Sequence, residues 1–238
     1  MNICLIQTEP QPGVDNLPFV RRGVETLGAD LYILPELFNV GFGNATAEPL
    51  KYAEPLQGPL VGKLQLALDS RPQSSLVAGL LERDGDHLHN SAAIVQRGFV
   101  SSYRQKSPPH RFGRCFTPGD YQTFYLGRRE FGFQALFGLM ICHDYYMAED
   151  FFAHYKSQRA DAIIMIAESA ENKWRREFPD LCKQFEMSAL VCNAAGISMG
   201  GSCAWDSAGT SVPICRSCGS KCNQLSEFPE IGILGLEI

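Results

Sequence analysis

Long apolar runs are missing from this sequence. No stretch reaches the length of about 18 apolar residues that a membrane-spanning helix requires. The beginning of the chain also lacks a basic segment with a cleavage signal, so we expect a cytoplasmic protein. No repeat of fixed period, low-complexity tract or linker divides the 238 residues, and we therefore expect a single domain over residues 1–238.

An excess of positive charge is missing as well. The formal net charge is -5, with 20% charged and 45% hydrophobic residues. Nucleic acids and anionic membranes attract basic proteins, so the charge argues against both as partners. The hydrophobic fraction is typical of a globular chain that can bury a sizeable core. We expect a small molecule as the partner.

Cysteine, in contrast, is plentiful. The nine cysteines form an odd count, and without a secretion signal they indicate free thiols rather than a disulfide framework. Four of them could ligate structural zinc or an iron–sulfur cluster, because three have ligand-like spacing. The alternative is an exposed hairpin rich in Gly and Ser whose thiols bind nothing. These four are Cys203, Cys215, Cys218 and Cys222.

Apolar runs and helical spacings alternate along the first two-thirds of the chain, with hairpins between them. The pattern predicts an α/β protein with a mixed sheet, or two sheets, covered by helices. Residues 39–58, rich in Gly and Pro, are expected to form a loop. The expected strands are 3–7, 31–34, 75–81, 91–95, 99–103, 131–141, 161–167 and 191–198, and the expected helices are 17–27, 60–68, 147–158 and 171–190, the last broken at Pro179.

The expected strand 131–141 ends abruptly at Cys142, and a helical segment follows. A thiolate at such a corner is stabilised by the positive end of the helix, and free backbone N–H groups there could bind an oxyanion. This is the arrangement of a nucleophile elbow, with Cys in place of Ser. The competing interpretation is a packing residue, because cysteine is among the most buried residue types.

Two further strand ends carry reactive side chains. Glu36 follows the run 31–34 between apolar residues, and burial would raise its pKa toward that of a general base. Lys106 follows the strand 99–103 and precedes two prolines. Taken singly, a solvated glutamate and a surface lysine are the alternatives. Together with Cys142 they can supply a base, a positive charge and a nucleophile.

At this point the chain resembles the nitrilase, or carbon–nitrogen hydrolase, superfamily. The resemblance covers nearly the whole chain, with the three reactive residues in the right order. The similar segments are Leu34-Pro35-Glu36, Tyr103-Arg104-Gln105-Lys106, Phe116-Thr117-Pro118-Gly119-Asp120, Gly138-Leu139-Met140-Ile141-Cys142-His143-Asp144 with Glu149, Glu186 with Val191-Cys192-Asn193-Ala194-Ala195-Gly196, and Trp205-Asp206-Ser207-Ala208-Gly209.

The resemblance implies a four-layer αββα sandwich that pairs into a dimer, and a covalent thioester intermediate formed without metal or cofactor. It implies that Glu36 is the general base, Lys106 the oxyanion and orienting residue, and Cys142 the nucleophile. The backbone N–H of His143 would be a second oxyanion donor. Asp144 is expected to cap the following helix. The side chains expected to line the substrate pocket are His143, Tyr145, Trp174, Arg111 and Arg114.

One departure from the superfamily pattern concerns a second glutamate. Many members carry it shortly before the Phe-Thr-Pro-Gly turn, but the segment from Lys106 to Pro118 contains no acidic residue, and Phe112 stands near the expected place. We expect hydrolysis of a small linear amide, nitrile-related or N-carbamoyl substrate. The alternative is a degenerate superfamily member that binds a ligand without catalysis.

Overall fold

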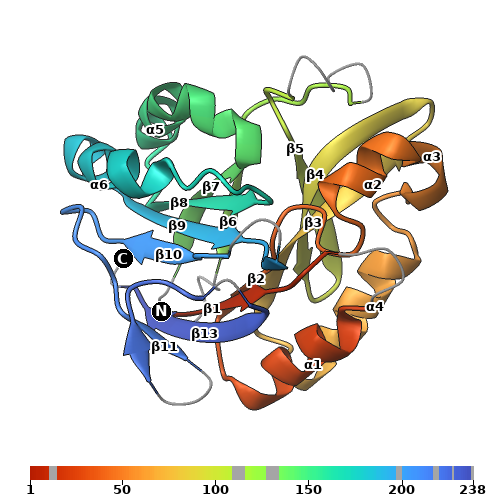
Figure 1. The fold of residues 1–238 in the computed structure, drawn as a ribbon, viewed down its shortest axis with the longest axis horizontal. Coiled ribbons are helices and arrows are strands. Elements are labelled where there is room, and N and C mark those ends of the chain that lie inside the picture. Colours follow the sequence, from red (N-terminus) through yellow and green to blue (C-terminus); the bar gives the residue numbers. More distant parts are fainter. Residues whose placement is uncertain are drawn as a thin grey trace.

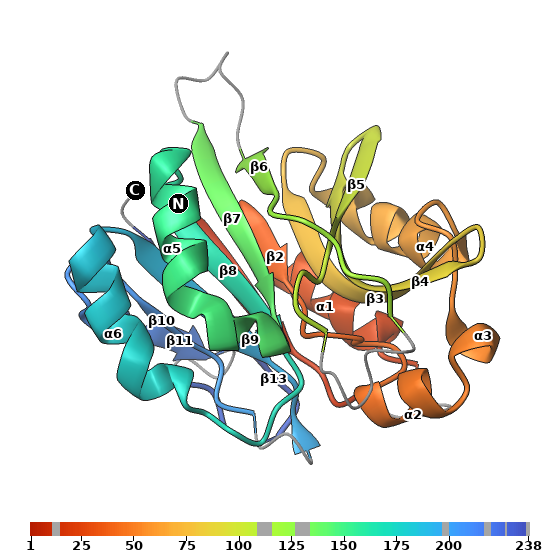
Figure 2. The same ribbon diagram turned by 90° about the horizontal axis from the view of Figure 1, so that it is seen from above.

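The fold is a sandwich of two β-sheets with helices on both outer faces, which makes four layers (Figures 1 and 2). The computed structural model describes residues 1–10, 15–108, 116–126, 134–196, 200–216, 220–226 and 228–236. The expectation of an αββα sandwich is confirmed.

The larger sheet contains eight strands of the described chain, which are β1 (Asn2–Gln7), β2 (Leu31–Ile33), β3 (Ser75–Asp84), β4 (His87–Gln96), β5 (Phe99–Arg104), β11 (Ile214–Arg216), β12 (Lys221–Cys222) and β13 (Glu230–Gly235). Their order is β12-β11-β13-β1-β2-β3-β4-β5. The neighbours β1, β2 and β3 are parallel, whereas β4 and β5 continue the sheet as antiparallel hairpins. Strand β13 pairs antiparallel with β1, so both ends of the described chain lie in one sheet.

The smaller sheet contains five described strands, β6 (Thr123–Leu126), β7 (Ala135–Ile141), β8 (Ala162–Ala167), β9 (Ser188–Asn193) and β10 (Cys203–Trp205). The three central strands β7, β8 and β9 are parallel, and all of their residues are buried. Parallel strands covered on both faces read as continuous apolar runs, which explains why the sequence revealed them. Their carboxyl ends meet at one edge of the sheet, where the candidate site lies.

Helices cover the two outer faces. Helices α1 (Leu17–Thr26) and α4 (Pro59–Ala67) pack on the larger sheet, and α5 (Ala148–Ser157) and α6 (Trp174–Phe185) cover the smaller one (Figure 2). Side chains alternate along β1, so they pack on both faces of the larger sheet. Ile3 and Leu5 belong to the core between the sheets, whereas Cys4 and Ile6 pack with the residues of α1 and α4.

Four elements expected from the sequence need correction, one of them the strand expected at residues 191–198, which is β9 (Ser188–Asn193). Residues 39–58 are not all loop, because α2 (Phe42–Ala47) and α3 (Pro49–Tyr52) form there. Pro179 lies inside α6 without ending it, and the helix stops at Phe185, so residues 188–190 belong to β9. The strand expected at residues 131–141 starts at Ala135, and residues 131–133 lie outside the described chain.

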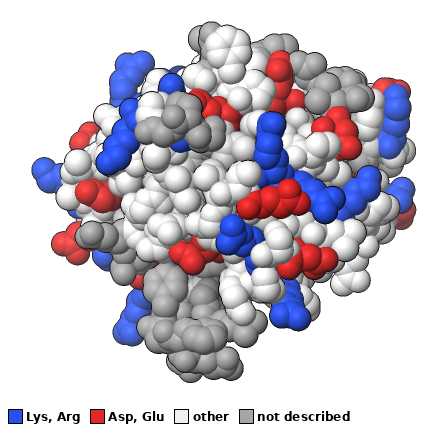
Figure 3. All heavy atoms as spheres, turned by 90° about the horizontal axis from the view of Figure 1, so that it is seen from below, with Lys and Arg blue, Asp and Glu red and all other residues white. Residues whose placement is uncertain are grey.

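Positive and negative side chains are interspersed on the face seen in Figure 3. The interspersed charges agree with the small net charge of -5. In the described residues, no helix is long and apolar enough to cross a membrane.

Candidate active site

Cys142 lies where β7 gives way to a 3-10 helix (Cys142–Met147) that leads into α5. Its backbone φ is +40°, a left-handed conformation that residues other than glycine adopt at a cost of order 1–3 kcal/mol. The seven residues of β7 are fully buried, while Cys142 itself is partly exposed. The sharp strand-to-helix corner expected for this cysteine is therefore present.

Asp144 fixes this corner from the inside. One carboxylate oxygen accepts hydrogen bonds from the Ile141 N–H at 2.9 Å and the Tyr103 hydroxyl at 2.5 Å. The other oxygen accepts bonds from the N–H and the hydroxyl of Ser107, at 2.8 and 2.9 Å. Asp144 was expected to cap the helix that begins near Met147. It lies instead at the third position of the 3-10 helix, and its carboxylate satisfies the Ile141 N–H at the start of that helix. The same carboxylate also joins the segment after β5 to the corner that presents Cys142.

Glu36 lies on a turn just after β2, and Gly79 of β3 makes the position possible. The Gly79 N–H donates to the Pro35 carbonyl at 3.1 Å. A Cβ added at Gly79 would lie 2.2 Å from the Leu37 nitrogen and 2.5 Å from the Glu36 Cα, far inside contact distance. Only glycine allows the two backbone segments to approach this closely. Leu37 completes the turn with a φ of +44°.

The Glu36 carboxylate is 1% exposed and meets Cys142 directly. Oε1 accepts from the Asn90 amide at 2.6 Å, Oε2 accepts from the Glu168 N–H at 2.8 Å, and the Cys142 thiol hydrogen-bonds to the same carboxylate. Burial raises the pKa of Glu36 to about 7, although these bonds oppose the rise. Burial, followed by repulsion from Glu36, also raises the pKa of the Cys142 thiol well above its usual value. At neutral pH the pair therefore holds a protonated thiol beside a carboxyl group whose pKa lies close to the ambient pH.

The structure does not bring Lys106 to this pair. Its ammonium lies 3.3 Å from Asp120 Oδ1 and 4.3 Å from the centroid of the Tyr121 ring. Strand alternation explains the direction, since Tyr103 points into the core and Arg104 points away toward Glu82. Lys106 then falls on the outer face with Arg104.

Gln105, rather than Lys106, points inward from the end of β5. Its N–H continues the pairing of β5 with β4 by donating to the Asn90 carbonyl at 2.8 Å. Its side-chain Nε2 donates to the Ile141 carbonyl at 2.8 Å, and its Oε1 accepts from Asn90 Nδ2 at 3.1 Å. The amides of Asn90 and Gln105 thus connect Glu36 to the residue that precedes Cys142. Reading the alternation from the buried Tyr103 would have identified Gln105 in the sequence.

Glu168 is a site residue that the sequence reasoning missed. It follows β8, whose end lies beside the end of β7 because Ile141 pairs with Ile166. Its N–H binds Glu36 and also the sulfur of Cys142, and its own Oε2 accepts from the Phe42 N–H at 2.7 Å. Burial, with repulsion from Glu36, raises the pKa of Glu168 to about 8. Adjacent parallel strands present their carboxyl ends at the same edge, so the pairing of β7 with β8 brings Glu168 to the site.

The remaining residues expected at the site are scattered. The His143 ring Nδ1 lies 2.8 Å from the Ser107 carbonyl, so this nitrogen donates. Tyr145 and Trp174 are 8% and 2% exposed, and they pack together in the core with Phe178. Arg111 and Arg114 lie outside the described residues, as does Phe112.

The cysteines near the C-terminus do not gather within the described chain. Cys203 belongs to the smaller sheet, whereas Cys215 and Cys222 lie on β11 and β12 of the larger one. Cys215 is paired with Lys221 rather than with Cys222, and Cys218 lies outside the described residues. In the part of the chain that the structure describes, no group of three His, Cys, Asp or Glu side chains is placed to hold a metal ion.

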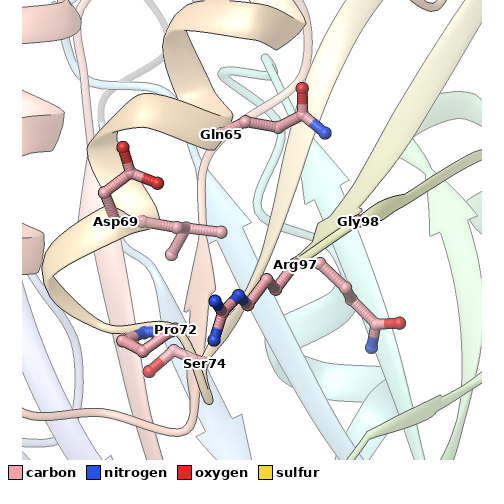
Figure 4. A pocket seen from close by; sticks show the side chains of 8 residues that line it. Gln65, Asp69, Pro72, Ser74, Arg97 and Gly98 are labelled. Carbon is pink, nitrogen blue, oxygen red and sulfur yellow. The ribbon is translucent and has the colours of Figure 1, made fainter.

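A surface hollow of about 240 Å³ lies elsewhere, between α4 and the turn that joins β4 to β5 (Figure 4). Its lining includes Gln65, Asp69 and Arg97, and it contains neither Glu36 nor Cys142. This hollow is therefore separate from the candidate active site.

The site thus places a cysteine on a strand-to-helix corner, facing a buried glutamate between two packed sheets. Residues 10–217 match the family described as Carbon-nitrogen hydrolase. The chain belongs to the carbon-nitrogen hydrolase family.

Relatives with names support this membership. A protein named Nitrilase from Pyrococcus abyssi (strain GE5 / Orsay) is 36% identical over 145 residues. The match covers 59% of this chain and 53% of the Pyrococcus protein, so the match spans about half the length of that relative.

Solved structures of an amidase from Nesterenkonia sp. AN1 have the same fold. The NitN amidase superposes with a TM-score of 0.81 at 20% identity, covering 100% of this chain and 93% of the amidase. A mutant of that amidase, with acrylamide added at its active-site cysteine, gives a TM-score of 0.80 at 20% identity and the same coverage. A mutant in complex with butyramide gives 0.79 at 19% identity, covering 98% of this chain and 90% of the amidase.

Proposed function

We propose that this protein hydrolyses a carbon–nitrogen bond of a small linear amide, nitrile-related or N-carbamoyl substrate through a thioester on Cys142. The observation that carries the proposal is the hydrogen bond between the Cys142 thiol and the buried Glu36 carboxylate, whose pKa is raised to about 7. A base of that strength is ionised in a substantial fraction of molecules at neutral pH and can still return its proton. Family membership supports the same chemistry.

In the first half of the reaction, Glu36 takes the thiol proton while the sulfur bonds to the substrate carbon. The carbonyl electron pair moves to oxygen, and we propose the His143 N–H as a donor to this oxyanion because it lies in the unpaired first turn of a helix. Glu36 then gives its proton to the leaving nitrogen as the C–N bond breaks. In the second half, Glu36 takes a proton from water, water attacks the thioester carbon, and the departing sulfur is reprotonated.

The triad expected from the sequence also included Lys106 as the oxyanion residue. That role would require its ammonium to leave Asp120 and Tyr121. We therefore propose Glu36 and Cys142 as the reacting pair, with the amide of Gln105 holding the strand end behind Cys142.

The test is intact-protein mass spectrometry after mixing with short primary amides, butyramide among them, together with an assay for released ammonia. We expect an acyl adduct on the wild type, ammonia release, and neither in Cys142→Ala. Ammonia release by Cys142→Ala at the wild-type rate would overturn the proposal.

The second candidate is a family member that binds a small amide without turnover. The observation that favours it is the direction of Lys106, which leaves an uncharged Gln105 on the inner face. A melting temperature that rises with butyramide while no ammonia appears would support this candidate, because a ligand that binds only the native state stabilises it.

For organisation, we propose one domain over residues 1–238, assembled as a homodimer in the cytoplasm. The free thiols of the described cysteines are consistent with a reducing compartment, and the resemblance to the nitrilase superfamily supports the dimer. Sedimentation as a 26.3 kDa monomer at micromolar concentration would contradict the dimer.

A further inference from the structure

The candidate site contains two carboxyl groups beside one thiol. The Glu168 N–H binds both Glu36 and the Cys142 sulfur, so the three residues form one cluster. The Glu168 and Glu36 carboxylates repel each other, and both repel the charged form of Cys142. In the described part of the chain, the partners of these three side chains are backbone N–H groups, the Asn90 amide and one another, with no lysine or arginine among them.

Glu168 has one oxygen engaged and one available. Oε2 accepts from the Phe42 N–H at 2.7 Å, which fixes the orientation of the carboxylate. Oε1 accepts no hydrogen bond from the described residues, and the side chain is partly exposed. Glu168 therefore differs from Glu36, both of whose oxygens are hydrogen-bonded and which is shielded from solvent. It can meet a ligand that approaches Cys142.

We propose that Glu168 is a specificity-determining residue, and that the site takes a substrate that carries a positive charge, such as an ammonium, amidinium or guanidinium group, close to the bond that is cleaved. This inference rests on the proposed function. A cation at Oε1 would balance the negative charge of the two carboxylates. An anionic substrate would place a further negative charge beside the ionised form of these carboxyls, and this repulsion disfavours its binding.

The raised pKa of Glu168, about 8, agrees with this inference. At neutral pH the free carboxyl holds a proton in most molecules, and a bound cation would replace that proton. Binding of a cationic amide should then release protons, while binding of a neutral amide should not.

The test compares primary amides of matched length, 3-aminopropanamide as the cation, butyramide as the neutral compound and succinamate as the anion. We expect kcat/KM to favour the cation over butyramide by roughly tenfold or more, the size expected for one charge-assisted hydrogen bond. Glu168→Gln, which keeps the shape and the acceptor for Phe42, should reduce this ratio to near one. Glu171→Gln removes the same charge three residues away, at an exposed carboxylate paired with Lys173, and should keep the wild-type ratio.

A second measurement does not depend on turnover. Cys142 is labelled with a methanethiosulfonate carrying either trimethylammonium or sulfonate, and peptide mass mapping follows the rate at this cysteine alone. Labelling that favours the cationic reagent in the wild type and in Glu171→Gln, but not in Glu168→Gln, supports the inference even if no amide is hydrolysed. Hydrolysis without charge preference overturns the inference and leaves the proposed function standing. Absence of both amide hydrolysis and charge-selective labelling overturns the inference and the proposed function together.

Discussion

Glu36 follows a strand of the larger sheet, Cys142 follows a strand of the smaller sheet, and their side chains share a hydrogen bond. The distance between the proposed base and the proposed nucleophile is thus set by the packing of the two sheets. The apolar side chains between the sheets, such as Leu5 and Ile33, are fully buried. Close-packed interiors of this kind hold their geometry firmly, so the core contributes to the alignment of the pair.

Substitution of Cys142 should separate folding from chemistry. Cys142→Ala is expected to melt within a few degrees of the wild type and to lose amide hydrolysis by on the order of 10³-fold or more, because the nucleophile is absent. Cys142→Ser should also be poor, since a hydroxyl needs a stronger base than Glu36. Circular dichroism melting and kcat/KM on short amides measure both effects. Wild-type hydrolysis by Cys142→Ala would rule out the thioester.

The raised pKa of Glu36 predicts how activity depends on pH. The base must be ionised to take the thiol proton, so kcat/KM should rise with pH through about 7. Glu36→Gln keeps the shape but removes the base, and its activity should collapse across the whole range. A Glu36→Gln protein with the wild-type rate would show that Cys142 uses another base.

The free energy of unfolding should fall as the pH rises, which is opposite to the trend of kcat/KM. A carboxyl whose pKa is higher in the folded protein than in the unfolded chain stabilises the fold at low pH, and this contribution is lost as pH rises through the folded pKa. The pKa values of about 7 for Glu36 and about 8 for Glu168 place this loss between about pH 5 and 8. Glu36→Gln should therefore gain melting temperature relative to the wild type as the pH is raised from 5 to 8. An unchanged difference over that range would contradict the burial of an ionisable Glu36.

Substitutions of the neighbouring residues Gln105 and Lys106 should have different effects on kcat/KM. Lys106→Ala removes a surface pair with Asp120 and should change kcat/KM by less than about threefold. Gln105→Leu leaves the buried Ile141 carbonyl without its donor and should lower kcat/KM by roughly tenfold or more. Steady-state kinetics on the same amide decides between them. The reverse order of effects would return Lys106 to the catalytic group.

Gly79 should be among the glycines least tolerant of substitution. Gly79→Ala places a methyl group 2.2 Å from the Leu37 nitrogen, and overpacking of this kind costs about 1–3 kcal/mol or more of unfolding free energy. Gly62→Ala in α4 is the matched control, because nothing lies within 4 Å of its added Cβ. Gly62→Ala should stabilise the protein slightly, since alanine is the better helix former. Equal unfolding midpoints of the two variants in urea would contradict the close approach at Glu36.

The positions of Glu36 and Cys142 were predictable because buried parallel strands appear in the sequence as apolar runs. Each of the two residues stands where such a run ends. The role expected for Lys106 stays a prediction. The sequence reasoning did not consider that the alternation of β5 continues past its last residue and decides which neighbour points inward. Glu168 was missed because its role depends on which strands are adjacent, and β8 becomes a neighbour of β7 only in the folded sheet.

The short helices of residues 42–52 were missed for a different reason. The surrounding segment, residues 39–58, contains three glycines and two prolines, and α2 is six residues long, which is too short for periodicity to be visible. The Phe42 N–H in α2 contacts Glu168, so tertiary contacts support this segment. Pro179 was read as a break, yet α6 continues through it because its apolar face, with Phe178 and Cys182, is held against the smaller sheet.

The pairing of a protonated thiol with a carboxylate also has a consequence for chemical durability. Hydrogen peroxide reacts with thiolates far faster than with thiols. Because Cys142 keeps its proton at rest, its oxidation to a sulfenic acid should be slow compared with that of a cysteine whose pKa is depressed. The protein would then keep Cys142 reduced under oxidative stress although this residue is partly exposed.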